Sequence, residues 1–240
     1  MILSLLFSGG DPLSILAVLL LTLPIMMLAL SVHETAHGFV AWKCGDNTAY
    51  NLGRLSLNPL KHLDPVGFLC LLIFGFGWAK PVPINTRNFR NPKRGMALSA
   101  LAGPVANLLL GLVSAVLYGV CWGVVHYFSY ADGVSNFLYT LLSLLRQAFL
   151  YGAYINFVYM VFNMIPIPPF DGSRVALAFL PAKTYFGLMR YERQIMFGIL
   201  IALLLCSYIF SFSPFGWVAE RLTDLIARPI FNGVLRGLLH

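Results

Sequence analysis

The sequence predicts an all-α polytopic membrane protein with about four transmembrane helices and a re-entrant or short β-hairpin region on the cytoplasmic side. Three observations carry this prediction: 59% of the 240 residues are hydrophobic, only 10% are charged, and the charges leave long gaps. A soluble domain carries about 25% charged residues. The same composition excludes intrinsic disorder, and four widely spaced cysteines indicate neither a disulfide framework nor a zinc ribbon.

The expected spans are the four long stretches without Asp, Glu, Lys or Arg. Each exceeds the roughly 20 apolar residues that a helix needs to cross ~30 Å of hydrocarbon. They are Pro12–Val32, Gly95–Ala131, Gln147–Phe170 and Gln194–Ala219. The first is not a cleavable signal peptide, because it lacks a basic n-region and continues into polar residues.

A fifth apolar stretch, Pro65–Ala79, is short and interrupted by glycines. We expect a re-entrant or interfacial loop here, which is allowed at depth only where protein shields the backbone. Residues 54–58 and 82–85 alternate apolar and polar positions, which predicts a short hairpin around it. The C-terminal stretch Trp217–His240 is amphipathic, and we expect it to lie on a membrane face.

The basic residues predict the orientation. Five of them lie in one connector without acidic residues (Lys80, Arg87, Arg90, Lys93 and Arg94), whereas residues 127–136 contain neither Lys nor Arg. The positive-inside rule therefore places residues 43–94 and 171–193 in the cytoplasm. The net charge of +7 then reflects topology and attraction to anionic lipid, so no nucleic-acid partner is expected. From the compactness and the missing targeting segment, we expect a prokaryotic plasma membrane.

Glu34 lies on the direct continuation of the first span, between His33 and His37. The two histidines fall on one helical face, at the spacing with which two imidazoles bind one Zn²⁺. Glu34, about 100° around the helix, can take a proton from a zinc-bound water. Ionisable groups at membrane depth are costly unless they are paired or bind metal. The sequence therefore predicts one Zn²⁺ per chain, with its site toward the cytoplasmic side.

A catalytic zinc needs a third protein ligand and one position open to water. Asp171 is the favoured candidate, because it follows three prolines (Pro166, Pro168 and Pro169) that unwind the end of the third span. Asp64 is the rival ligand. Asp171 could instead cap a helix that starts near Ser173.

Five segments, in this order along roughly residues 15–180, resemble the site-2 protease family of intramembrane zinc metalloproteases. They are His33–His37, Gly53–Pro59, Gly77–Pro83, Ala102–Asn107 and Asn163–Gly172. The resemblance implies that His33, His37 and Asp171 are the zinc ligands and that Glu34 is the catalytic base and acid. It also implies that Asn107 and Asn163 hold the substrate backbone or stabilise the oxyanion.

The resemblance further implies a single membrane-embedded protease domain over residues 1–240. Its catalytic core covers about 12–180, and residues 195–240 add a helix and the amphipathic segment. Segment 52–85 resembles a membrane-associated β-loop that pairs with an unwound substrate. The expected substrates are transmembrane segments of other membrane proteins. The chain resembles a minimal form without PDZ or CBS domains.

The alternative is a non-catalytic membrane metal-binding protein or transporter whose histidines bind a passing ion. Inverted halves and a second polar cluster across the bilayer would indicate a transporter. The sequence shows neither feature, which favours the protease. It makes no prediction about the oligomeric state.

Overall fold

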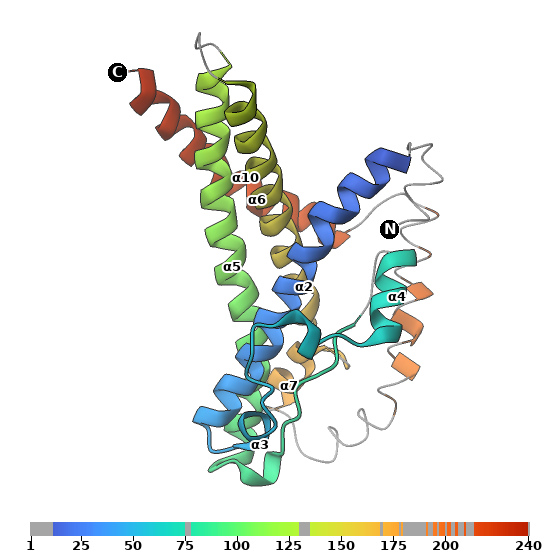
Figure 1. Ribbon diagram of the computed structural model, residues 1–240. Helices are drawn as coiled ribbons and strands as arrows, with labels where there is room; N and C mark the ends of the chain where they lie inside the picture. The colour runs from blue at the N-terminus through green and yellow to red at the C-terminus, as the bar shows by residue number, and fades with distance from the viewer. Residues whose placement is uncertain are drawn as a thin grey trace. The chain divides into compact units, whose positions relative to one another are not determined.

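The computed structural model describes residues 12–74, 78–129, 135–168, 170–177 and 214–239, together with isolated residues and short runs between 179 and 209. The regular elements in this part of the chain are all helices (Figure 1). The chain divides into two compact units. The first consists of residues 1–106 and 162–212, and the second of residues 107–161 and 213–240.

The first unit is built on α2 (Pro12–Lys43), a 32-residue helix. The helix ends in a Schellman motif, in which Asp46 N–H donates to the Ala41 carbonyl and Gly45 N–H to the Trp42 carbonyl. Gly45 has φ +111°, which only glycine adopts readily. The shorter helices of this unit are α3 (Thr48–Asn51), η1 (Pro59–Lys61), α4 (Pro65–Phe74), η2 (Thr86–Asn88) and α7 (Asp171–Leu177).

Three of the described helices are long and apolar enough to cross a membrane: α2 from Leu16, α5 (Pro92–Phe128) and α6 (Asn136–Asn163). The first two expected spans lie largely within α2 and α5. The predicted bounds of the third were wrong, because α6 already begins at Asn136 and carries Arg146 within it. A long arginine side chain can reach the membrane interface from inside a span. A helix can therefore extend beyond the charged residue that ends a charge-free stretch.

Eleven of the 26 residues of the fourth expected span, Gln194–Ala219, lie outside the described residues, so the count of four stays a prediction. Its last residues already belong to α10 (Pro214–Leu239). The expected loop at 65–79 is a helix, α4, over its first ten residues. The hairpin is not confirmed, since 54–58 and 82–85 form no strand; the pairing nearby is a single antiparallel bridge between Leu63 and Ala79.

Asp46 ties the chain after α2 to the segment before α5. Its buried carboxylate accepts from the Asn85 backbone N–H at 2.7 Å and from Asn88 Nδ2 at 2.8 Å. It also accepts from the backbone N–H and the hydroxyl of Thr48. Burial alone would raise the pKa of Asp46, but these hydrogen bonds hold its pKa below the ordinary value, so the carboxylate stays ionised.

Replacing Asp46 with Asn is expected to lower stability by about 2 kcal/mol, the scale of a hydrogen bond to a charged group. Because the pKa is depressed in the folded state, the contribution is present above the unfolded pKa of about 3.9 and is lost as the pH falls through the lower folded pKa. Thermal unfolding in detergent checks this. The Tm difference between wild type and D46N should be largest near pH 7 and should shrink below pH ~4. Asp224→Asn, which breaks an exposed i,i+4 pair with Arg228, should cost less than about 0.5 kcal/mol.

The second unit consists of the later part of α5, α6 and α10, and Figure 1 shows α5 and α6 side by side. Its core contains the fully buried residues Ala115, Ala153, Phe157 and Ala219. Small residues on α5 let its partners approach closely. A Cβ at Gly111 would lie 2.7 Å from the Phe157 ring, and one at Gly119 would lie 2.8 Å from the Ala227 carbonyl oxygen of α10.

Gly119→Ala is therefore expected to destabilise the unit by about 1–3 kcal/mol, the usual cost of overpacking. Gly233→Ala, on the opposing α10, provides the control, because nothing lies within 4 Å of its added Cβ. That change should stabilise the helix by up to about 1 kcal/mol, since alanine is the better helix former. Equal Tm values for the two variants would contradict the packing described here.

Candidate metal centre

His33 and His37 lie one turn apart on α2, with both side chains buried. Their ring centroids are 4.5 Å apart and the ring planes are nearly perpendicular, at 89°. The two Nε2 atoms lie 2.9 Å apart. His37 Nδ1 lies 2.7 Å from the backbone carbonyl oxygen of Ser99 on α5. Because a carbonyl oxygen can only accept, Nδ1 carries the proton, and Nε2 presents its lone pair to His33.

The chain reverses sharply between α6 and α7. The helix ends at Asn163, and the prolines that follow cannot continue it. Gly172, the second residue of α7, lets the helix pack against the start of this turn, because a Cβ there would run into the backbone of Met164 and Ile165. The Phe162 ring packs edge-on against the Phe170 ring at 4.3 Å. The turn thereby brings the first residue of α7, Asp171, back to α2.

Asp171 Oδ2 lies 3.1 Å from His33 Nε2 and 3.2 Å from His37 Nε2. An aspartate side chain is an anion at neutral pH, so it can offer an oxygen ligand to a cation. Two nitrogen lone pairs and an anionic oxygen converging on one point favour a shared cation. Tetrahedral zinc, with bonds of about 2.0–2.1 Å, separates its ligand atoms by roughly 3.3 Å. The observed spacings of 2.9, 3.1 and 3.2 Å therefore fit zinc, with a fourth position left for water.

One turn of α5 packs against the imidazole rings of His33 and His37. Ser99 contacts His37 twice: its carbonyl oxygen accepts from Nδ1, and its hydroxyl donates to the His37 carbonyl at 2.9 Å. Four residues further along, Gly103 lies directly against both rings. A Cβ there would lie 2.5 Å from His37 Nε2 and 2.6 Å from His33 Cε1. The ring positions thus depend on a hydrogen-bond acceptor at 99 and on the missing side chain at 103.

Glu34 lies beside the cluster and is not one of the three convergent groups. Its Oε2 accepts from the backbone N–H of Val82 at 2.8 Å. A cavity of about 190 Å³ opens here and is lined by all four of these side chains, His33, Glu34, His37 and Asp171. The arrangement places a carboxylate that can accept a proton at the edge of a candidate metal site with room for water.

The sequence model of peptidase family M50 matches residues 21–207. The chain belongs to peptidase family M50. This is the family of the site-2 proteases, so the predicted family is confirmed. Membership, together with three apolar helices, makes it a multi-pass membrane protein. The metal of this M50 chain is zinc, in agreement with the fit of the cluster.

Among the relatives of this M50 chain is the "Putative zinc metalloprotease YwhC" of Bacillus subtilis (strain 168), 36% identical over 82% of the chain and 86% of the relative. The "Putative zinc metalloprotease Rip2" of Mycolicibacterium smegmatis is 29% identical over 67% of the chain and 58% of the relative. The "Putative zinc metalloprotease MJ0611" of Methanocaldococcus jannaschii is 31% identical over 60% and 62%. These relatives support a metalloprotease. No solved structure shows a significant match to this M50 chain.

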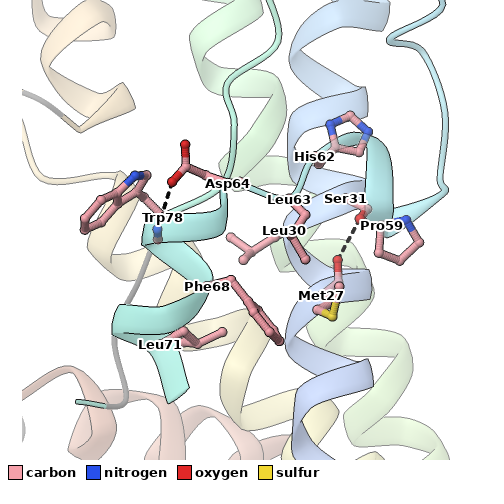
Figure 2. Close-up of a pocket in the computed structure, with 12 residues that line it drawn as sticks. Met27, Leu30, Ser31, Pro59, His62, Leu63, Asp64, Phe68, Leu71 and Trp78 are labelled. Carbon is pink, nitrogen blue, oxygen red and sulfur yellow. Dashed lines mark hydrogen bonds between the residues drawn. The ribbon is translucent and has the colours of Figure 1, made fainter. Parts of the chain in front are cut away.

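In this M50 chain, the structure brings together the three side chains predicted as ligands, and their assignment to zinc stays a prediction. The rival, Asp64, is not in this group. Figure 2 shows it at the start of α4, where its carboxylate accepts from Gly67 N–H at 2.8 Å. It lines a separate cavity of about 30 Å³, with room for about one water. Asp171 is itself the first residue of α7, so the helix expected near Ser173 begins two residues earlier.

The two asparagines lie in different places in this M50 chain. Asn163 lines the 190 Å³ cavity with the metal cluster. Asn107 belongs to the second unit, where its buried Nδ2 donates to Asn156 Oδ1 at 2.8 Å. Asn107 thus has the hydrogen-bond partner that a polar group within a span needs. Binding of substrate by either asparagine stays a prediction.

Sequence reasoning missed three residues of this M50 site: Ser99, Val82 and Arg174. Val82 acts through its backbone N–H, and Ser99 accepts from His37 Nδ1 through its backbone carbonyl. Any residue type carries these atoms, so the sequence holds no signal for either contact. Arg174 does carry one. It follows Asp171 by three residues on α7, a spacing that places both on one helical face, and it lines the cavity.

Proposed function

We propose that this M50 chain is an intramembrane zinc metalloprotease that hydrolyses peptide bonds within or near transmembrane segments of other membrane proteins. The supporting observation is the position of the cluster. His33, Glu34 and His37 all lie on α2, within the stretch Leu16–Lys43 that is long and apolar enough to span a membrane. His33 precedes Lys43 by ten residues, which is about 15 Å at 1.5 Å per residue. Hydrolysis at this depth acts on the part of a substrate that the bilayer covers.

Zinc held by His33, His37 and Asp171 supplies a Lewis acid, which polarises a carbonyl group and lowers the pKa of water. Glu34 takes one proton of the attacking water as the water oxygen bonds to the carbonyl carbon. When the C–N bond breaks, Glu34 gives that proton to the leaving nitrogen, and the products are a carboxylic acid and an amine. The Val82 N–H, bonded to Glu34 Oε2, orients the carboxylate and leaves Oε1 for the proton.

The substrate must lose its helical hydrogen bonds before it can be cut. Segment 52–85 is the proposed docking site for the unwound stretch by β-augmentation. In support, residues 80–85 have no helical assignment and lie next to Glu34 through Val82. Asn163, in the same cavity, is the proposed donor to substrate backbone. The lysines and arginines of 43–94 support a site that faces the cytoplasm of a prokaryotic cell.

The decisive experiment uses the purified full chain in proteoliposomes with a single-span reporter substrate. Cleavage should stop on chelation and return with about one equivalent of zinc per chain. Mass spectrometry of the products should place the cut inside the apolar segment of the reporter. A zinc-loaded chain that cuts only a soluble flanking peptide would contradict the intramembrane assignment.

A further inference from the structure

Arg174 stands out among the residues around the metal cluster. It is half-buried and lines the same 190 Å³ cavity as Glu34 and Asp171. Its guanidinium has five N–H donors and no acceptor. Within the described part of the chain, however, no hydrogen bond or ion pair engages it: both neighbouring carboxylates are beyond 4.0 Å. A cation placed in a protein cavity without a partner favours an anion that arrives from outside.

The charge balance of the cavity points the same way. Glu34, Asp171 and Arg174 together carry one net negative charge, with the histidines neutral. A zinc dication changes this to one net positive charge. The loaded cavity therefore favours a ligand that carries or develops a single negative charge.

One atom of the reaction meets this description. The scissile carbonyl oxygen becomes an oxyanion when water adds to the carbon, and after the C–N bond breaks it is one oxygen of the product carboxylate. We propose that Arg174 is a catalytic residue, which donates hydrogen bonds to this oxygen and holds the product carboxylate. The inference rests on the proposed function and extends it with a second positive group beside the reacting carbonyl.

An arginine suits this role better than a lysine. Its planar fork can give two parallel N–H donors to a carboxylate, whereas an ammonium acts as a point charge. Arg174 and Asp171 both lie on α7. The short distance from Asp171 to His33 fixes the position of the first residue of this helix. The same short helix thus sets the position of both the metal ligand and the proposed donor.

The test measures binding, so that it gives an answer even if no substrate is cleaved. The probes are two apolar hexapeptides that end in leucine, identical except for a free C-terminal carboxylate or a C-terminal amide. Binding to the zinc-loaded full chain in detergent is measured by calorimetry. The wild type should prefer the acid by about tenfold or more, the scale of a hydrogen bond to a charged group. Arg174→Met should remove this preference, while R174K should keep part of it.

Zinc content is measured in parallel and should stay at the wild-type level in both variants. The control is Arg94→Met, which removes an exposed guanidinium outside the cavity and should leave the acid preference unchanged. In cleavage assays, R174M should lower kcat by about 10²-fold with little change in KM, as for loss of an oxyanion donor. An undiminished preference for the acid in R174M, or loss of zinc from R174M and R174K alike, would overturn the proposal. Failure of the proposed protease function would appear instead as no cleavage by a wild type that still prefers the acid.

Discussion

Replacement of Glu34 by Gln is expected to lower the rate of peptide cleavage by about 10²–10⁴-fold or more. The variant should still bind one zinc per chain. The amide cannot accept a proton from water, but it keeps the size of the side chain and an oxygen that can accept from Val82 N–H. The metal should stay, because the three proposed ligand atoms come from His33, His37 and Asp171. The measurements are cleavage of the single-span reporter and zinc content by elemental analysis.

Glu220→Gln is the matched control, since Glu220 is an exposed glutamate on α10 in the second unit. It should cleave at the wild-type rate. If E34Q also cleaves at that rate, Glu34 is not the base, and another group must take the proton from water.

The second large effect is expected for Gly103→Ala, which adds a single methyl group. The added methyl group would lie 2.5–2.6 Å from atoms of both imidazoles, so at least one ring must leave its place. The Ser99 carbonyl would then lose its hydrogen bond to His37 Nδ1. Loss of such supporting contacts lowers metal affinity by about 10–100-fold elsewhere. Zinc affinity is measured by competition with a chromophoric chelator, and cleavage should fall at limiting zinc.

Gly237→Ala provides the comparison for this glycine, because nothing lies within 4 Å of its added methyl group. That variant should bind zinc like the wild type. Unchanged zinc affinity in G103A would show that the rings can shift without loss of the cluster, and that α5 does not hold them in place.

The parts of the site that could be predicted depend on local geometry or on the cost of charge in a membrane. His33 and His37 share a face because four residues make about one helical turn. Asp171 was favoured because prolines free the chain before it, and the structure brings it to His33, 138 residues earlier in the chain, and to His37. In both cases a general physical rule limits where the side chain can be.

The parts that could not be predicted depend on which surfaces meet. The contact between Gly103 and the imidazoles joins two helices far apart in the chain, and nothing in the Gly-Pro dipeptide says which side chain fills the space. The start of α6 was misplaced because Arg146 was treated as a boundary, although a helix tolerates one long cation. The expected hairpin follows an alternating pattern that an extended segment without a ladder can also show.

Two of the three proposed ligand side chains share one turn of α2, whereas the third, Asp171, lies at the start of α7. The spacing of the histidines is kept by backbone hydrogen bonds of a single helix, so it survives as long as that helix does. The cluster of three, by contrast, exists only while Asp171, at the start of α7, stays within reach of the two histidines. Mild heating or a harsh detergent should therefore release zinc and stop cleavage well before circular dichroism detects any loss of helix.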